Sequence, residues 1–151
     1  MPSSYHHGVR VIEVNEGTRP IRMPSTAVIG LVATADDANA DAFPLDTPVL
    51  ITNLGDALAD AGSNGTLATS LKAIDSQAQP ITVVVRVEEG ESEPETEANI
   101  IGGVDATGKR LGLQALLVAE QHVGVKPRII GVPGLDTQAV TTELVTVAQK
   151  L

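Results

Sequence analysis

The residues with the clearest chemical potential lie between Gly103 and Lys109, where two glycines are separated by four residues and the second glycine is followed by a lysine. This is how a P-loop opens: its backbone N–H groups cradle phosphate oxygens, and its lysine reaches the β- and γ-phosphates. The next residue of a P-loop is Ser or Thr, which binds magnesium, but here it is Arg110. The pattern leaves two interpretations open. One is a small α/β nucleotide-binding domain, and the other is a reverse turn built on Asp105 and Gly108.

The segment 88–97 is the second candidate, because six of its ten residues are glutamates. A calcium loop needs ligands at ordered positions and a closing bidentate glutamate, and this segment has neither. We therefore expect a solvated loop whose charges repel one another. A generic adaptor, in which this loop binds a basic partner, is a further hypothesis.

Neither a metal site nor a catalytic site is predicted. The neighbouring His6 and His7 point apart, and no second ligand cluster accompanies them. His122 lies at the predicted end of a helix, where a positive charge suits the helix dipole. The chain has no cysteine and no Gly-x-Ser-x-Gly motif to supply a nucleophile. We expect no cofactor and no enzymatic activity.

A set of strands must position these candidates. The strand predicted over residues 81–87 says most about the fold. Five of the eight residues from Pro80 to Val87 are Ile or Val, which is typical of a strand buried on both faces. Similar strands are predicted over residues 27–34, 49–52 and 128–132. Gly30, inside the first of these strands, permits the close approach of a neighbouring element.

Helical patterns separate most of these strands. The predicted caps are Asn53 and Thr66 for two helices, and Gly124 is predicted to end the third and strongest one. Residues 35–48 are polar and are expected to form a surface loop. The last helix, capped by Asp136 or Thr137, has no stop signal, so we expect the domain to continue beyond it. The four helices are predicted over residues 54–61, 66–78, 111–122 and 136–151.

The composition fits one globular domain with an acidic surface. The chain has 151 residues, 42% of them hydrophobic, and a formal net charge of −9. Nucleic acids and anionic membranes bind clustered Lys and Arg, so neither is an expected partner. No apolar run approaches the roughly 20 residues of a membrane span. Only 1% of the residues are aromatic, so the core must be aliphatic.

The first part of the chain is distinct from the rest. An apolar–polar alternation, broken only at Ile12, predicts a half-buried strand formed by Val9, Arg10, Val11, Ile12, Glu13 and Val14. A linker with two prolines follows it. We therefore divide the chain into an N-terminal arm and linker, residues 1–24, and an α/β domain, residues 25–151. In the predicted domain, helices are layered on a mostly parallel or mixed sheet.

Six segments carry a resemblance to a known family. The chain resembles the N-terminal part of the contractile tail sheath proteins of temperate myophages, and it is also similar to the sheaths of R-type bacteriocins. The order and number of the six segments make the resemblance specific, and the resemblance extends over nearly the whole chain. The segments are 5–19 (YHHGVRVIEVNEGTR), 48–53 (PVLITN), 65–68 (GTLA), 99–104 (NIIGGV), 112–116 (GLQAL) and 126–137 (KPRIIGVPGLDT).

This resemblance implies a structural subunit that polymerises around a tail tube and contracts to drive the tube through a cell envelope. It implies that terminal arms add strands to the sheets of neighbouring subunits, a role that the segment from Val9 to Val14 would fill. Family members are more than twice as long, so contact with the tail tube is expected from the C-terminal half that is absent here. The implied location is the virion tail or bacteriocin particle, after assembly in the host cytoplasm.

Overall fold

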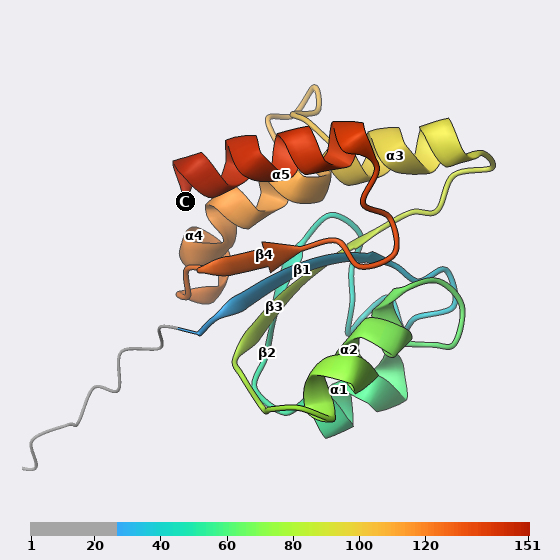
Figure 1. Ribbon diagram of the computed structural model, residues 1–151, viewed down its shortest axis with the longest axis vertical. Helices are drawn as coiled ribbons and strands as arrows, with labels where there is room; N and C mark the ends of the chain where they lie inside the picture. The colour runs from blue at the N-terminus through green and yellow to red at the C-terminus, as the bar shows by residue number, and fades with distance from the viewer. Residues whose placement is uncertain (1–26) are drawn as a thin grey trace, which may run out of the picture.

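The computed structural model describes residues 27–151, so the predicted arm, including the segment from Val9 to Val14, lies outside the described residues. The strands form one sheet in the order β2-β3-β1-β4. Strand β1 is parallel to β3 and β4, and β2 is antiparallel to β3 (Figure 1). The predicted α/β fold with a mixed sheet is confirmed. The strands are β1 (Ile29–Thr34), β2 (Pro48–Ile51), β3 (Thr82–Val87) and β4 (Ile129–Gly131).

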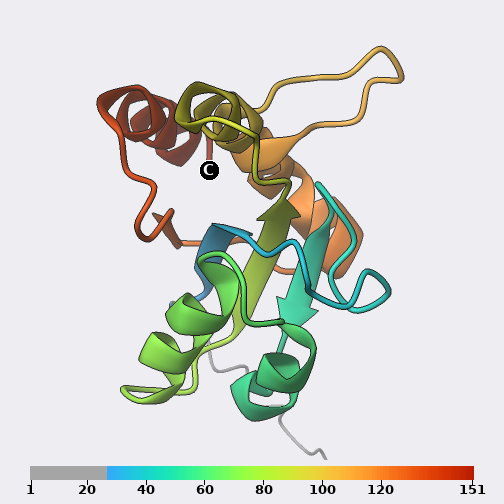
Figure 2. The same cartoon turned by 90° about the vertical axis from the view of Figure 1, so that its right-hand side faces the viewer.

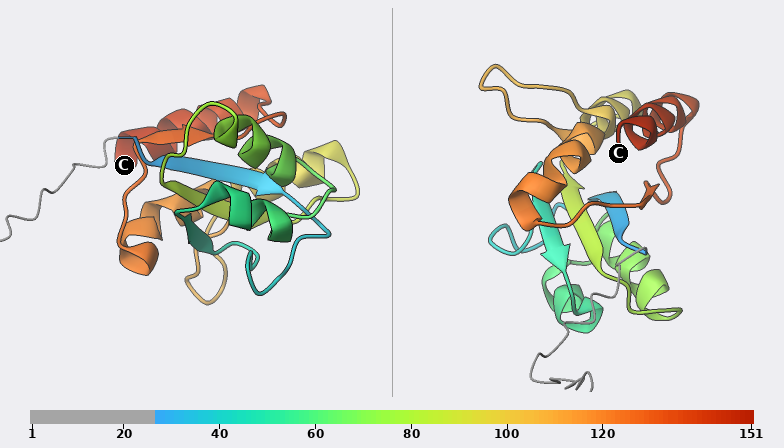
Figure 3. Two further views of the ribbon diagram at one scale, coloured as in Figure 1. Left: turned by 90° about the horizontal axis from the view of Figure 1, so that it is seen from below. Right: turned by 90° about the vertical axis from the view of Figure 1, so that its left-hand side faces the viewer.

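Helices cover both faces of this sheet (Figures 1 and 2). On one face lie α1 (Leu54–Asp60) and α2 (Leu67–Asp75), which are in front of the strands in the view from below (Figure 3). The other face carries four elements and the larger of the two core clusters. These elements are α3 (Glu93–Ile101), the 3₁₀ helix η1 (Gly112–Val118), α4 (Ala119–Val123) and α5 (Gln138–Lys150).

Strand β3 joins the two clusters because all six of its residues are buried. Val83 and Val85 pack into the cluster that contains α3, η1 and α5. Val84 points the opposite way, into the cluster under α1 and α2. Successive side chains of a strand alternate between faces, so an unbroken valine run supplies apolar surface to both layers.

Gly30 allows the close packing that the sequence predicts. A Cβ atom at this position would lie 2.9 Å from the Cβ of Pro127 and 3.2 Å from a methyl group of Ile130. The backbone N–H of Arg128 donates to the carbonyl of Val28 at 2.9 Å, which draws the start of β4 onto β1.

Asn53 and Gly124 lie at helix ends, as the sequence predicts. The Asn53 side chain accepts from the backbone N–H of Gly55 at 3.1 Å, and Gly124 ends α4 in the left-handed conformation. Thr66 occupies the N-cap position of α2, as predicted, but its side chain makes no capping hydrogen bond. Its hydroxyl accepts from the backbone N–H of Thr34 at 3.2 Å, so this side chain ties the end of β1 to the start of α2 and caps no helix.

The acidic segment also differs from the prediction, because α3 begins at Glu93, inside the expected loop. Ser92 precedes the helix in an extended conformation and Pro94 lies in its first turn, where a missing N–H costs no helical hydrogen bond. Glu93 and Glu95 lie in that same turn, where negative charge interacts favourably with the helix dipole. The composition of the segment was therefore compatible with a helix start.

The strongest predicted helix is mostly a 3₁₀ helix. Residues 112–118 form η1, and only five residues continue as α4. Leu113 and Leu116 are three residues apart and fully buried, and a three-residue repeat places them on one face of a 3₁₀ helix. Gly112 has φ +54°, and a Cβ atom there would lie 2.4 Å from the carbonyl oxygen of Ile100. This close contact with α3 fixes the irregular start.

The connection from β1 to β2 enters the core, unlike the predicted surface loop. Ala35 and Phe43 are buried within it. Arg86, which is 7% exposed, donates from Nε to the carbonyl of Phe43 at 2.6 Å and from Nη1 to the carbonyl of Ala35 at 2.9 Å. A cation of β3 therefore supplies the hydrogen bonds that this buried backbone requires.

Replacing Arg86 by Met should lower the free energy of unfolding by about 2–4 kcal/mol, because it leaves two buried carbonyl oxygens without donors. The exposed Arg128 is the matched control, and Arg128→Met should change the stability by less than about 0.5 kcal/mol. Urea unfolding measures both. Equal losses in the two variants would contradict a special role for the buried guanidinium.

Candidate functional site

The loop between Gly103 and Lys109 connects α3 to η1 and projects from the body of the protein (Figures 2 and 3). Val104 and Arg110 form an antiparallel bridge across its base. The backbone N–H of Gly108 donates to the carbonyl of Asp105 at 3.0 Å. The reverse-turn interpretation is confirmed.

Asp105 occupies the centre of this turn. Its carboxylate accepts from the Thr107 hydroxyl at 2.6 Å and from the backbone N–H groups of Thr107 and Lys109 at 2.7 and 2.9 Å. These bonds, the Thr107 hydroxyl first among them, hold the pKa of Asp105 below its ordinary value of 3.8. The N–H groups that a P-loop would offer to phosphate already bind a carboxylate of the chain itself.

The remaining P-loop features are also missing from the geometry. The Lys109 amine donates to the carbonyl of Leu45 at 3.0 Å. The element that follows is the 3₁₀ helix η1, whereas a P-loop leads directly into an α-helix whose N-terminus faces the phosphate. This loop is unsuited to nucleotide binding.

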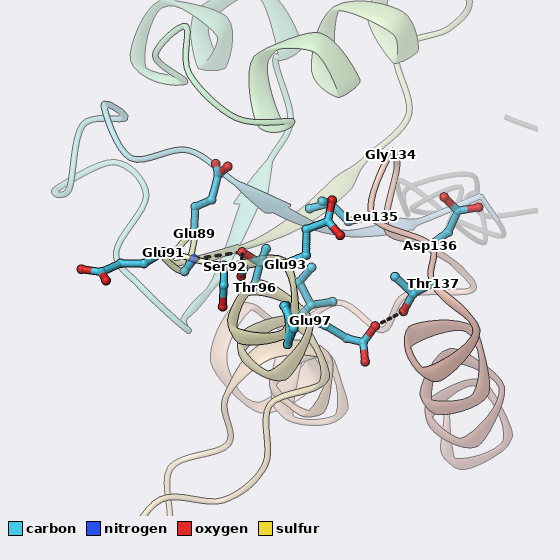
Figure 4. A pocket seen from close by; sticks show the side chains of 13 residues that line it. Glu89, Glu91, Ser92, Glu93, Thr96, Glu97, Gly134, Leu135, Asp136 and Thr137 are labelled. Atoms are coloured by element: carbon cyan, nitrogen blue, oxygen red, sulfur yellow. Dashed lines mark hydrogen bonds between the residues drawn. The ribbon is translucent and has the colours of Figure 1, made fainter.

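A groove of about 730 Å³ lies at the carboxyl ends of β3 and β4, between the segment 89–97 and residues 134–137. Open α/β sheets commonly bind ligands at this edge. Five carboxylates line the groove, and we call it the acidic groove: Glu89, Glu91, Glu93, Glu97 and Asp136. Figure 4 shows its labelled carboxylates pointing in different directions around the rim.

Hydrogen bonds shape both sides of the acidic groove. The Thr96 hydroxyl accepts from the backbone N–H of Gly90 at 3.0 Å and donates to the carbonyl of Ser92, which fixes the entry into α3. The Thr137 hydroxyl donates to Glu97 and accepts from the N–H of Val140, so it caps α5 as predicted and joins α5 to α3 (Figure 4). The cooperation of these two helices is what the sequence alone did not reveal.

The carboxylates of the groove do not converge. Among residues 27–151, no group of three or more acidic or histidine side chains is arranged to hold a metal ion. His122 is exposed at the end of α4 and lies outside the groove. In the same part of the chain, every helix is too short or too polar to cross a membrane.

Comparison with known proteins decides the family. Residues 26–87, which include β1 to β3, match the family described as "Tail sheath protein Gp18 domain III N-terminal region". Over 99% of its length the chain is 56% identical to the tail sheath protein of Escherichia phage P2. Over 100% of its length it is 47% identical to the major tail sheath protein of Serratia phage KSP20. The chain belongs to the tail sheath proteins.

This sheath chain spans 39% of the length of each of the two relatives. The family match ends at Val87, so it contains the central strand but neither the turn at Asp105 nor the acidic groove. The two relatives, by contrast, align across both features. Both features therefore belong to the sheath sequence even though the family description stops before them.

Lys109→Ala should leave the free energy of unfolding within about 0.5 kcal/mol of the parent, because an exposed amine with one carbonyl contact contributes little. Magnesium-ATP should not raise the melting temperature of either protein. An ATP-dependent rise in the parent that disappears in Lys109→Ala would contradict the structural interpretation of this loop.

Asp105 should also make stability depend on pH. Its pKa is lower in the folded chain than its ordinary value of 3.8, so folding favours the ionised form. The stabilisation is complete above that value and is lost as the pH falls through the folded-state pKa. The difference in unfolding free energy between the parent and Asp105→Asn should therefore shrink as the pH falls below 3.8. The control is Lys109→Ala, which keeps the backbone N–H that binds Asp105 and should retain the pH dependence of the parent. If the difference in unfolding free energy between the parent and Asp105→Asn instead grows as the pH falls, Asp105 is not the source of this pH dependence.

Proposed function

We propose that this chain is part of a non-enzymatic sheath subunit that polymerises around a tail tube and contracts to drive the tube through a cell envelope. The observation that carries the proposal is the 56% identity with the tail sheath protein of phage P2, maintained over 99% of the chain. Among residues 27–151, the loop that resembles a P-loop is closed by its own Asp105, which weakens the alternative of a nucleotide-binding domain. Contact with the tail tube would come from the part of the sheath protein that this chain does not include.

The proposed partners are neighbouring sheath subunits, joined through terminal arms. The segment Val9, Arg10, Val11, Ile12, Glu13 and Val14 is the proposed donor strand, because its alternating pattern and proline-containing linker suit strand addition to a neighbouring sheet. The acidic net charge of −9 supports a partner other than nucleic acid or membrane. In this proposal residues 1–24 are the arm and residues 25–151 are the domain that it tethers.

The proposed location follows from the proposed assembly. The subunit would reside in the tail of a phage virion or in an R-type bacteriocin particle, and it would fold and assemble in the host cytoplasm. The names of the two phage relatives support the tail location.

Val11→Pro should prevent sheath assembly, whereas Val11→Ala should permit it. Proline removes a backbone donor in mid-strand and fixes φ, while alanine only shortens an apolar side chain. Both substitutions are made in the complete sheath protein, and negative-stain microscopy scores the polymers. Equal melting temperatures for the two variants would exclude a folding defect. Normal sheaths from Val11→Pro would show that this segment is not an assembly strand.

A further inference from the structure

The connection between α1 and α2 contains a chemically labile pair of residues, Asn64 and Gly65. Asparagine is among the thermolabile residues of proteins, because the backbone nitrogen of the next residue can attack its side-chain amide. Glycine in that next position hinders the attack least, since it has no side chain. Asn64 is the only asparagine of the chain that is followed by glycine. The sequence therefore marks Asn64 as the most reactive asparagine of the chain.

The fold itself requires the glycine of this pair. Gly65 has φ +82°, in the left-handed region that favours glycine. A Cβ atom at this position would lie 2.3 Å from the carbonyl oxygen of Thr34, at the end of β1. Any other residue would therefore collide with the backbone of β1 unless the connection shifted. The labile pair is thus tied to the way α2 approaches the sheet.

The two reacting groups are accessible and unengaged. Asn64 and Gly65 are both exposed to solvent. Among the hydrogen bonds of residues 27–151, none uses the side-chain amide of Asn64 or the backbone N–H of Gly65. The other asparagines in this range each donate a hydrogen bond from the side-chain amide: Asn39, Asn53 and Asn99.

Hydrogen bonds on either side anchor the reactive pair. The backbone N–H of Asn64 donates to the carboxylate of Asp37 at 2.9 Å. The backbone N–H of Thr66 donates to the carbonyl of Thr34 at 2.9 Å. The N–H of Gly65 thus lies between two anchored N–H groups, and its nitrogen is available to attack.

We propose that Asn64 is a site of spontaneous deamidation in the folded chain. The backbone nitrogen of Gly65 attacks Cγ of Asn64, the bond from Cγ to the side-chain nitrogen breaks, and the proton of the Gly65 N–H leaves with that nitrogen as ammonia. Water then opens the resulting succinimide at either carbonyl and leaves aspartate or isoaspartate. The amide and one water are thus converted to a carboxylic acid and ammonia, and no oxidant is needed. This inference goes beyond the proposed function and does not rest on it.

The products alter the connection between α1 and α2 in two ways. The backbone N–H of Asn64, followed by the N–H and hydroxyl of Ser63, holds the pKa of Asp37 below its ordinary value of 3.8, so Asp37 is ionised at neutral pH. Either product places a second carboxylate on the residue whose N–H binds Asp37, and like charges repel. Isoaspartate also lengthens the backbone by a methylene carbon between the anchors at Asp37 and Thr34. At least one of these anchors must then shift.

The test is incubation of the 151-residue chain at neutral pH, followed by peptide mapping with mass spectrometry. Asn64 should convert to both aspartate and isoaspartate, while Asn39, Asn53 and Asn99 stay intact over the same period. Enzymatic methylation of the free α-carboxyl group identifies the isoaspartate. The control is Asn64→Gln, which should lose both products because its longer side chain must close a larger ring. Gly65→Ala is unsuitable as a control, since its Cβ atom would disturb the fold.

The same chain unfolded in urea shows how the pair reacts without the fold. If Asn64 converts in urea but stays intact in the folded chain, the fold protects it and the inference is overturned. Conversion to aspartate without isoaspartate would also overturn it, because opening of a succinimide yields both products.

Melting temperatures test the effect on the two anchors. The isoaspartate product, separated by anion-exchange chromatography, is compared with Asn64→Asp. Both carry the added charge, but only the isoaspartate product has the longer backbone, so it should melt at the lower temperature. Equal melting temperatures would show that the lengthened backbone leaves both anchors undisturbed, against the inference.

Discussion

The structure depends on the burial of β3 on both faces. A strand without a solvent face needs an apolar layer on each side, and the chain supplies one layer before β3 and the other after it. The only charged residue of the strand, Arg86, is accommodated because its guanidinium donates hydrogen bonds to the buried carbonyls of Ala35 and Phe43. The same contacts hold the connection from β1 to β2 in place. The two apolar layers and the position of the connection thus follow from one buried strand.

This arrangement leaves the ends of the strands free for interaction. The interior is aliphatic, with Phe43 as its one aromatic side chain among the described residues, and its polar groups are engaged in hydrogen bonds. At the carboxyl ends of β3 and β4 lies the acidic groove.

Sequence reasoning succeeded where a local pattern has one physical solution. The valine run of β3, the close packing at Gly30 and the capping by Asn53 each follow from the residue itself. It failed where tertiary contacts decide between local alternatives. The leucine repeat of residues 112–118 fits both an α-helix and a 3₁₀ helix, and the contact of Gly112 with α3 selects the latter. The acidic groove requires α3 and α5 to meet through Glu97 and Thr137, 40 residues apart, which no local pattern predicts.

The most direct measurement is a cryo-electron microscopy map of particles assembled from the complete protein that contains this chain. Our account predicts a repeating layer around the tube in which residues 27–151 fit as described, with the sheet order β2-β3-β1-β4 retained in each subunit. Absence of this fold from the sheath layer would contradict the account.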